Sequence, residues 1–241
     1  MAFLPLHAAG IYTTTERGSK LSDFVVSSYI PTLSTLLRDG DSSVPFRLLA
    51  VAQPNTPNAS RLPNTTEELI RIRRFAGDLP IISLEGAEAT IGRVIDSMGK
   101  CSWIHLACHA AQDACDPAKS ALLLDDGNLH LSEIIKYPLP HAQFAFLSAC
   151  QTAAGDKQLP DEGAHLAAGM LFAGYSGVVA TMWPIQDDDA PKVAESFYSQ
   201  ILKDKQPDHM HAAHALHYTI QRLREEGAPL MSWVPFIHNG M

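Results

Sequence analysis

Two residues of this chain combine the side chains that nucleophilic catalysis requires. Cys150 follows the apolar run 143–148, and His109 follows a second apolar run at 103–108. A nearby imidazole turns a thiol into a strong nucleophile by accepting its proton, because the thiolate is the reactive form. The same imidazole can then protonate the amine that leaves an attacked amide. If the two runs are neighbouring strands, Cys150 and His109 face one crevice and could hydrolyse peptide bonds.

The placement of both residues depends on an alternation of predicted strands and helices. Strands are predicted at 46–52, 80–84, 103–108, 143–148 and 177–182, with a hairpin over 121–131 around the turn 125–127. One helix is predicted with Asn64 or Thr65 as its cap and Gly77 as its end. Further helices are predicted at 87–98, 162–173, from about 187 onward, and at 211–225. Glu67 and Glu68 fall in the first turn of the first helix, where they favour its positive end.

This alternation predicts an α/β fold with a mostly parallel sheet and helices on both faces. Sites in such sheets form beyond the carboxyl ends of the strands, where His109 and Cys150 would lie. No linker divides the chain, so we expect a single domain over 1–241. It would have a less regular lead-in at 1–45, with a short strand at 24–26 and a short helix at 31–37, and an α/β core at 46–241.

Structural explanations compete with the catalytic ones. A cysteine at the end of an apolar strand is often an inert packed residue, and a lone histidine there is usually structural. His105 shares strand parity with His109 and is predicted to be a hydrogen-bonded histidine of the core. A zinc site is the competing interpretation of the cysteines and histidines in 101–115, but their spacing matches no zinc motif. We predict no metal site and no cofactor.

Three consecutive acids, at 187–189, follow the predicted strand 177–182. Carboxylates stabilise the positive end of a helix, so helix capping is one interpretation. The other is that Asp187 forms an acidic wall of a substrate pocket, because it too lies beyond a strand's carboxyl end. A pocket lined by Asp187 would select a basic substrate side chain. The segment 174–177 is no nucleophile elbow, because its second glycine comes one position early.

Composition limits the classes of partner. The formal net charge of −8 argues against a nucleic-acid partner, which clustered cations would bind. No apolar run reaches the roughly 18 residues of a membrane span, and the N-terminus lacks the pattern of a signal peptide. The four cysteines do not form a disulfide framework, so we expect a reducing, cytoplasmic location. No glycine-rich phosphate-binding motif follows the first strand, which argues against a nucleotide-binding domain.

Eight short segments, spread over nearly the whole chain, match the pattern of one family in order: 4–8, 28–33, 62–68, 88–90, 104–109 (IHLACH), 147–152 (LSACQT), 177–187 and 233–236. Together they resemble the CHAT domain, a caspase-like module often found behind TPR repeats. The resemblance implies a caspase–separase type fold, with a dyad His after the third core strand and a Cys after the fourth. Those roles fall on His109 and Cys150, with backbone N–H groups at Ala110 and Cys150 binding the oxyanion.

One residue departs from this pattern. The family's dyad His is usually followed by Gly, whereas Ala110 follows here. Alanine keeps the N–H but resists positive φ, so we expect a distorted oxyanion hole. The first hypothesis is a cysteine endopeptidase that acts on a protein or peptide and is regulated by TPR repeats or another protein partner. The alternative is a non-catalytic scaffold or docking module of the same fold.

Overall fold

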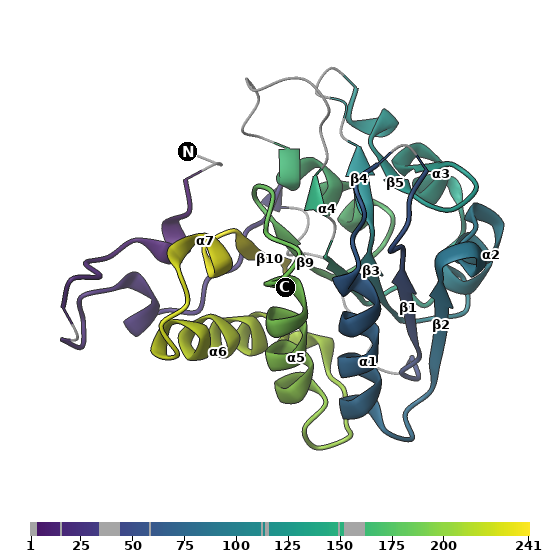
Figure 1. Ribbon diagram of the computed structural model, residues 1–241. Helices are drawn as coiled ribbons and strands as arrows, with labels where there is room; N and C mark the ends of the chain where they lie inside the picture. Colours follow the sequence, from purple (N-terminus) through teal and green to yellow (C-terminus); the bar gives the residue numbers. More distant parts are fainter. Residues whose placement is uncertain are drawn as a thin grey trace.

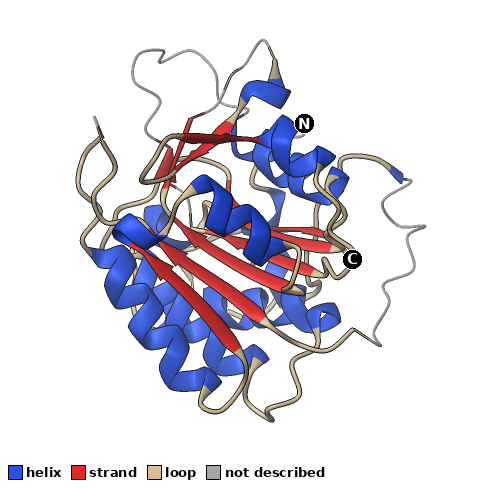
Figure 2. Ribbon diagram, turned by 90° about the vertical axis from the view of Figure 1, so that its right-hand side faces the viewer, coloured by secondary structure: helices blue, strands red, loops and turns tan. Residues whose placement is uncertain are grey.

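A six-stranded sheet runs through the middle of the protein, in the order β10-β9-β7-β3-β1-β2 (Figure 1, Figure 2). Neighbouring strands are parallel, except that β10 runs antiparallel to β9. The predicted mostly parallel α/β sheet is therefore confirmed. The strands are β1 (Leu48–Ala52), β2 (Ile81–Glu85), β3 (Trp103–Ala107), β7 (Phe144–Leu147), β9 (Gly177–Thr181) and β10 (Phe236–Gly240).

The computed structural model describes residues 4–14, 16–33, 44–57, 59–111, 113, 116–148, 150–151 and 162–241. For residues 117, 150–151 and 162–165 it describes the backbone alone. All residues of β1, β3 and β9 are buried. Strands covered on both faces are continuous apolar runs, which is why the sequence pattern located them within one or two residues.

Helices cover both faces of this sheet (Figure 2). One face, with Trp103, Phe144 and Phe146, packs against α1, α5 and α6. The other face, with Ile104 and Leu106, packs against α2, α3 and α4. The helices are α1 (Asn64–Ala76), α2 (Ile91–Met98), α3 (Leu131–Lys136), α4 (Glu162–Phe172), α5 (Ala190–Ile201), α6 (Ala212–Glu225) and α7 (Leu230–Trp233). Short 3₁₀ turns lie at Leu6–Ala8, Leu21–Asp23, Gly86–Glu88, Pro117–Lys119 and His209–His211.

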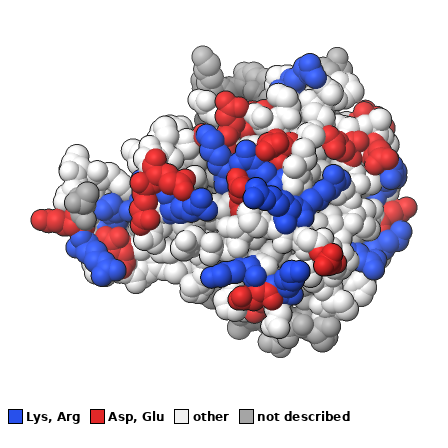
Figure 3. All heavy atoms as spheres, turned by 60° about the horizontal axis from the view of Figure 1, so that its bottom comes forward, with Lys and Arg blue, Asp and Glu red and all other residues white. Residues whose placement is uncertain are grey.

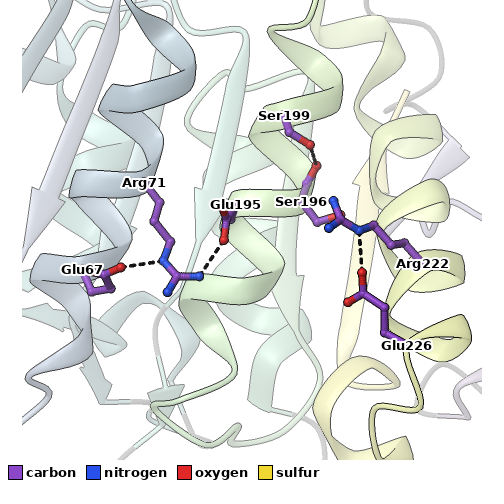
Figure 4. A network of polar contacts seen from close by, with 7 residues as sticks. All are labelled: Glu67, Arg71, Glu195, Ser196, Ser199, Arg222 and Glu226. Atoms are coloured by element: carbon purple, nitrogen blue, oxygen red, sulfur yellow. Dashed lines mark hydrogen bonds and ion pairs between the residues drawn. The ribbon is translucent and has the colours of Figure 1, made fainter.

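Arg71 links α1 to α5 at the protein surface (Figure 4). Its Nε atom lies 2.7 Å from Oε1 of Glu67, and its Nη1 atom lies 2.6 Å from Oε2 of Glu195 in α5. The Arg71 and Glu195 side chains are 31% and 34% exposed. Ion pairs at this exposure contribute about 0–1 kcal/mol each, so the buried faces of α1 and α5 provide most of their mutual stabilisation.

A second, four-stranded sheet has the order β6-β5-β4-β8 and lies beyond the carboxyl ends of β3 and β7. The chain passes from β3 into β4 through Cys108, and from β7 into β8 through residues 148–149. β4 and β8 are parallel, whereas β4–β5 and β5–β6 are antiparallel. The strands are β4 (His109–Ala111), β5 (Ala121–Leu123), β6 (Asn128–His130) and β8 (Cys150–Gln151).

Two predicted boundaries were wrong for physical reasons, and one strand was not predicted. Helix α2 begins at Ile91 rather than at 87, because Thr90 is extended and Oδ1 of Asp126 accepts the Ile91 N–H at 2.8 Å. Leu131 begins α3 instead of ending the hairpin, because the Glu133 carboxylate accepts the His130 N–H and starts a helix. No strand is predicted after 225, but Phe236–Gly240 forms the edge strand β10.

The lead-in also differs from the prediction. No strand forms at 24–26. This segment follows a 3₁₀ turn, and its Phe24 side chain is 72% exposed. The predicted helix at 31–37 lies mostly outside the described residues. The described part of the lead-in, called the arm below, lies beside the C-terminal elements (Figure 1). Tyr29 N–H donates to the His238 carbonyl at 2.8 Å, and Gly240 N–H donates to the Tyr29 carbonyl at 2.8 Å.

His238 in β10 is buried where the arm meets the sheet. The Ser28 hydroxyl lies 2.6 Å from the Gly240 carbonyl oxygen and 2.8 Å from Nδ1 of His238. Since a carbonyl only accepts, the hydroxyl donates to Gly240 and accepts from Nδ1–H of the imidazole. Nε2 is then the unprotonated nitrogen, and it is buried with no hydrogen-bond partner among the described residues. Burial lowers the pKa of His238 to about 4.

The described surface bears on the partner classes expected from composition. On the face drawn in Figure 3, Lys and Arg side chains lie among Asp and Glu side chains and form no large patch of one sign. No helix within the described ranges has both the length and the apolar character that crossing a bilayer requires.

Candidate active site

The structure brings the backbones of His109 and Cys150 together. β3 and β7 are parallel neighbours, and their continuations β4 and β8 pair in parallel with His109 directly opposite Cys150. Adjacent strands lie about 4.8 Å apart, and residues paired in register belong to the same face of a sheet. The predicted adjacency of the two strands is confirmed, and the register makes these two residues nearest cross-strand neighbours.

His109 is held in one orientation by the loop that precedes α1. Its side chain is buried, and Nε2 lies 2.7 Å from the carbonyl oxygen of Ser60. Because a carbonyl oxygen can only accept, Nε2 carries the proton, and the lone pair of the neutral ring is on Nδ1. The same contact stabilises the ring when both nitrogens are protonated. His109 therefore has the oriented, tautomer-selected imidazole that a general base requires.

Ala110 adopts ordinary strand geometry. It is the middle residue of β4, paired with Leu122 on one side and with Gln151 on the other. Among the described non-glycine residues, Lys205 has a positive φ and Ala110 does not. The premise behind the expected distortion, a positive φ at this position, is therefore wrong. The backbone conformation at this position suits any residue, so the replacement of glycine does not distort β4.

Asp187 caps a helix, but not the helix that follows it. Its Oδ2 atom accepts the backbone N–H of Asn64, the first residue of α1, at 3.1 Å, and Asp188 accepts from the Asn64 side chain at 2.6 Å. Asp189, which precedes α5, makes no side-chain cap there. The Asp187 side chain is half-buried at the start of α1. That position is close in sequence to Ser60, whose loop contacts His109.

Two other cysteines are packed residues of the core. Cys101 and Cys108 are both buried and reduced. Burial raises the pKa of the Cys101 thiol to about 11, so it is protonated at neutral pH and is a poor nucleophile. Cys115 lies outside the described residues. Within the described part of the chain, no group of three potential ligands is placed to hold a metal ion.

A buried polar chain lies in the layer beneath His109, and sequence reasoning recognised one of its members. His105 is fully buried with Nδ1 at 3.3 Å from the Tyr198 hydroxyl, which confirms a hydrogen-bonded core histidine. Its Nε2 lies 3.0 Å from Oε1 of Glu68. The Ser148 hydroxyl donates to Oε2 of Glu68 at 3.1 Å. Glu68, which the sequence places in the first turn of a helix as a carboxylate favouring its positive end, is 1% exposed.

A sequence signal for Glu68 existed. The buried positions of α1 include Thr65, Glu68, Leu69 and Ile72, which recur at the three- and four-residue spacing of one helix face. Position 68 therefore belonged to the apolar face and not to the solvated one. A carboxylate at such a position indicates a partner in the core.

Comparisons with known proteins agree with this architecture. A family model described as the CHAT domain matches residues 1–241. Two similar solved structures are of a cysteine proteinase, and each aligns with 80% of the chain. The Arg-specific gingipain R (RgpB) is 13% identical, is covered over 45% of its own chain and gives a TM-score of 0.49. The complex of Porphyromonas gingivalis RgpB pro- and mature domains is 14% identical, is covered over 47% of its own chain and gives a TM-score of 0.50. The chain thus spans less than half of either gingipain chain. No curated protein matches it.

Proposed function

The chain belongs to the CHAT domain family, and on that premise we propose that it is a cysteine endopeptidase with Cys150 as nucleophile and His109 as general base and acid. The observation that carries the proposal is the register of β4 with β8, which pairs the two residues across adjacent strands. The contact of His109 Nε2 with the Ser60 carbonyl adds support, because it selects the tautomer with the proton on Nε2 and the basic lone pair on Nδ1.

The proposed reaction proceeds in two halves. Cys150 Sγ transfers its proton to Nδ1 of His109 and attacks the scissile carbonyl carbon, and backbone N–H groups at Ala110 and Cys150 stabilise the oxyanion. The imidazolium gives that proton to the departing amine as the C–N bond breaks, which leaves a thioester on Cys150. Water then attacks the thioester with His109 as base, releasing the carboxylic acid and regenerating the thiol.

Thiol labelling tests the dyad directly. A peptidyl chloromethyl ketone should alkylate Cys150, located by peptide mass spectrometry, and His109→Ala should slow this at least about 100-fold because the base is lost. His141→Ala, which changes an exposed histidine, is the matched control and should label at the wild-type rate. Labelling of Cys150 that is indifferent to His109→Ala would reject the peptidase and favour the docking alternative.

We propose further that Asp187 selects a basic substrate side chain. Its half-buried carboxylate binds the N–H of Asn64 at the start of α1. Asn64 is close in sequence to Ser60, whose carbonyl holds His109. A positional peptide library should show a preference for Lys or Arg before the scissile bond, and Asp187→Asn should weaken that preference while retaining a side chain that can accept the Asn64 N–H. A library profile that does not change in Asp187→Asn would remove Asp187 from the pocket.

Regulation by a protein partner is the last part of the proposal. The CHAT resemblance suggests TPR repeats or another regulatory protein as that partner. Labelling of Cys150 by the same probe, measured with and without a candidate partner, would detect activation as a change in rate.

A further inference from the structure

The Glu68 carboxylate is the centre of the buried polar chain. It contacts the Ser148 hydroxyl through Oε2 at 3.1 Å and Nε2 of His105 through Oε1 at 3.0 Å. The second contact has ion-pair distance, but the ring N–H is not aligned with the oxygen as a hydrogen bond. His105 in turn lies 3.3 Å from the Tyr198 hydroxyl. The four residues are between 0% and 3% exposed.

Burying this set of polar side chains in the core costs free energy. A carboxylate removed from water loses its hydration and needs partners that replace it. Around it the packing is aromatic: the His105 ring stacks on Phe146 at 5.0 Å between centroids and meets Tyr198 edge-on at 5.6 Å. Burial and the nearby charge of Glu68 raise the pKa of Tyr198 well above 10, so the phenol remains protonated at neutral pH. An apolar side chain at position 68 would avoid these costs.

The elements that Glu68 contacts suggest a role for this buried carboxylate. Glu68 lies in α1, which follows the loop whose Ser60 carbonyl orients His109. His105 lies in β3, four positions before His109. Ser148 directly follows β7 and lies two positions before Cys150. One carboxylate therefore contacts both strands that continue into the candidate site, from the helix that follows the orienting loop.

We propose that Glu68 and His105 are positioning residues for the Cys150–His109 dyad, an inference that rests on the proposed peptidase function. By binding Ser148, the Glu68 carboxylate sets where the end of β7 lies relative to β3. That relation determines the distance between a thiol on β8 and an imidazole on β4. Neither residue needs to touch substrate for this role, which acts through the strands.

Ser148→Ala is the sharpest test, because it removes the tie to β7 and changes no group proposed to meet substrate. The readout is the rate of Cys150 alkylation by iodoacetamide as a function of pH, since a thiolate paired with an imidazolium reacts below the pKa of a free thiol. We expect the rate at pH 6 to fall on the order of 10-fold, and the apparent pKa to rise toward about 8.5. Ser148→Thr keeps the hydroxyl and should restore most of the rate.

Ser102→Ala is the matched control. Ser102 is 1% exposed, and its hydroxyl donates to the Pro45 carbonyl at 3.1 Å and accepts from the Arg47 N–H at 3.0 Å. It precedes β3, at the end of that strand away from His109. The two variants remove the same atom from comparably buried serines. We expect Ser102→Ala to leave the pH–rate profile of Cys150 within about twofold of wild type, although removing a buried hydrogen bond also weakens its fold.

Glu68→Gln provides a second variant if Ser148→Ala does not fold. The amide has the shape of the carboxylate but no charge, and it places an oxygen at only one of the two carboxylate positions, so it cannot keep both the bond from Ser148 and the charged contact with His105. The same rise in apparent pKa is expected. Folded Ser148→Ala and Glu68→Gln proteins with wild-type profiles would overturn the positioning role and leave the dyad intact. If His109→Ala and wild type instead gave the same pH–rate profile for Cys150 alkylation, the peptidase proposal would be overturned, and this inference with it.

Discussion

Acid should destabilise this protein through His238, the buried histidine of β10. The unfolded chain takes up a proton on this side chain near pH 6.5, whereas the folded protein does so near pH 4. Between these values the unfolded state binds more protons, so the free energy of unfolding falls as the pH is lowered. The stabilisation is complete above about pH 6.5 and is lost progressively as the pH approaches 4.

The size of the effect follows from the two pKa values. A pKa lowered from 6.5 to about 4 corresponds to roughly 3 kcal/mol in the free energy of unfolding. About 2 kcal/mol of this should be lost by pH 5. The structural cause is the buried Nε2 of His238, which would have to carry the added proton with no acceptor among the described residues.

Urea unfolding at pH 7.5 and pH 5.0 measures this loss. In His238→Asn, the side-chain amide can donate to the Ser28 hydroxyl in place of Nδ1, and it does not titrate. We expect wild type to lose about 2 kcal/mol more than His238→Asn between the two pH values. Burial also lowers the pKa of His7, His209 and His217, but both proteins retain these groups and their effects cancel.

The exposed His141 supplies the control for this comparison. His141→Asn removes one histidine without touching the core, and it should lose as much stability as wild type between pH 7.5 and 5.0. Equal losses in wild type and His238→Asn would refute the reasoning, since they would mean that the folded protein does not resist protonation at His238.

Three further predictions concern packing and the site. Gly169→Ala should lower the free energy of unfolding, measured by urea denaturation, by about 1–3 kcal/mol, because the new Cβ would overlap the Leu131 side chain. A variant more stable than wild type would contradict the close approach of α3 and α4. Ala110→Gly should leave Cys150 labelling within about twofold and cost about 0.5–1 kcal/mol of stability, because no strained φ is relieved. Arg71→Ala should cost under about 1 kcal/mol, and less in 1 M salt; a larger loss would mean that the surface link dominates α1–α5 packing.

Much of the large sheet could be predicted from the sequence, because strands buried on both faces are unbroken apolar runs. The small sheet could not be predicted in full. β8 has two residues and β4 has three, too few for any periodicity, and their pairing is decided by the strands they continue. β10 was missed because Asn239 and Gly240 have low strand propensity, and contacts with β9 and the arm override it.

The site was predicted in outline by the positions of two residues at strand ends. What the sequence could not indicate was contact between distant segments. The Ser60 carbonyl that orients His109 is a backbone atom of an exposed loop, and no side-chain pattern marks it. The capping of α1 by Asp187 links residues 123 positions apart. The predicted capping role was correct in kind, but the helix was different.

The passage of β3 into β4 and of β7 into β8 makes the candidate site sensitive to chain length. A single residue inserted at Cys108 would shift β4 by one position against β8, and every side chain beyond it would turn to the opposite face. The β5–β6 turn, which Leu124 and Gly127 close by a backbone hydrogen bond of 2.8 Å, could lengthen without that effect. Related sequences should therefore vary in length at this turn and keep a constant residue count across the two junctions.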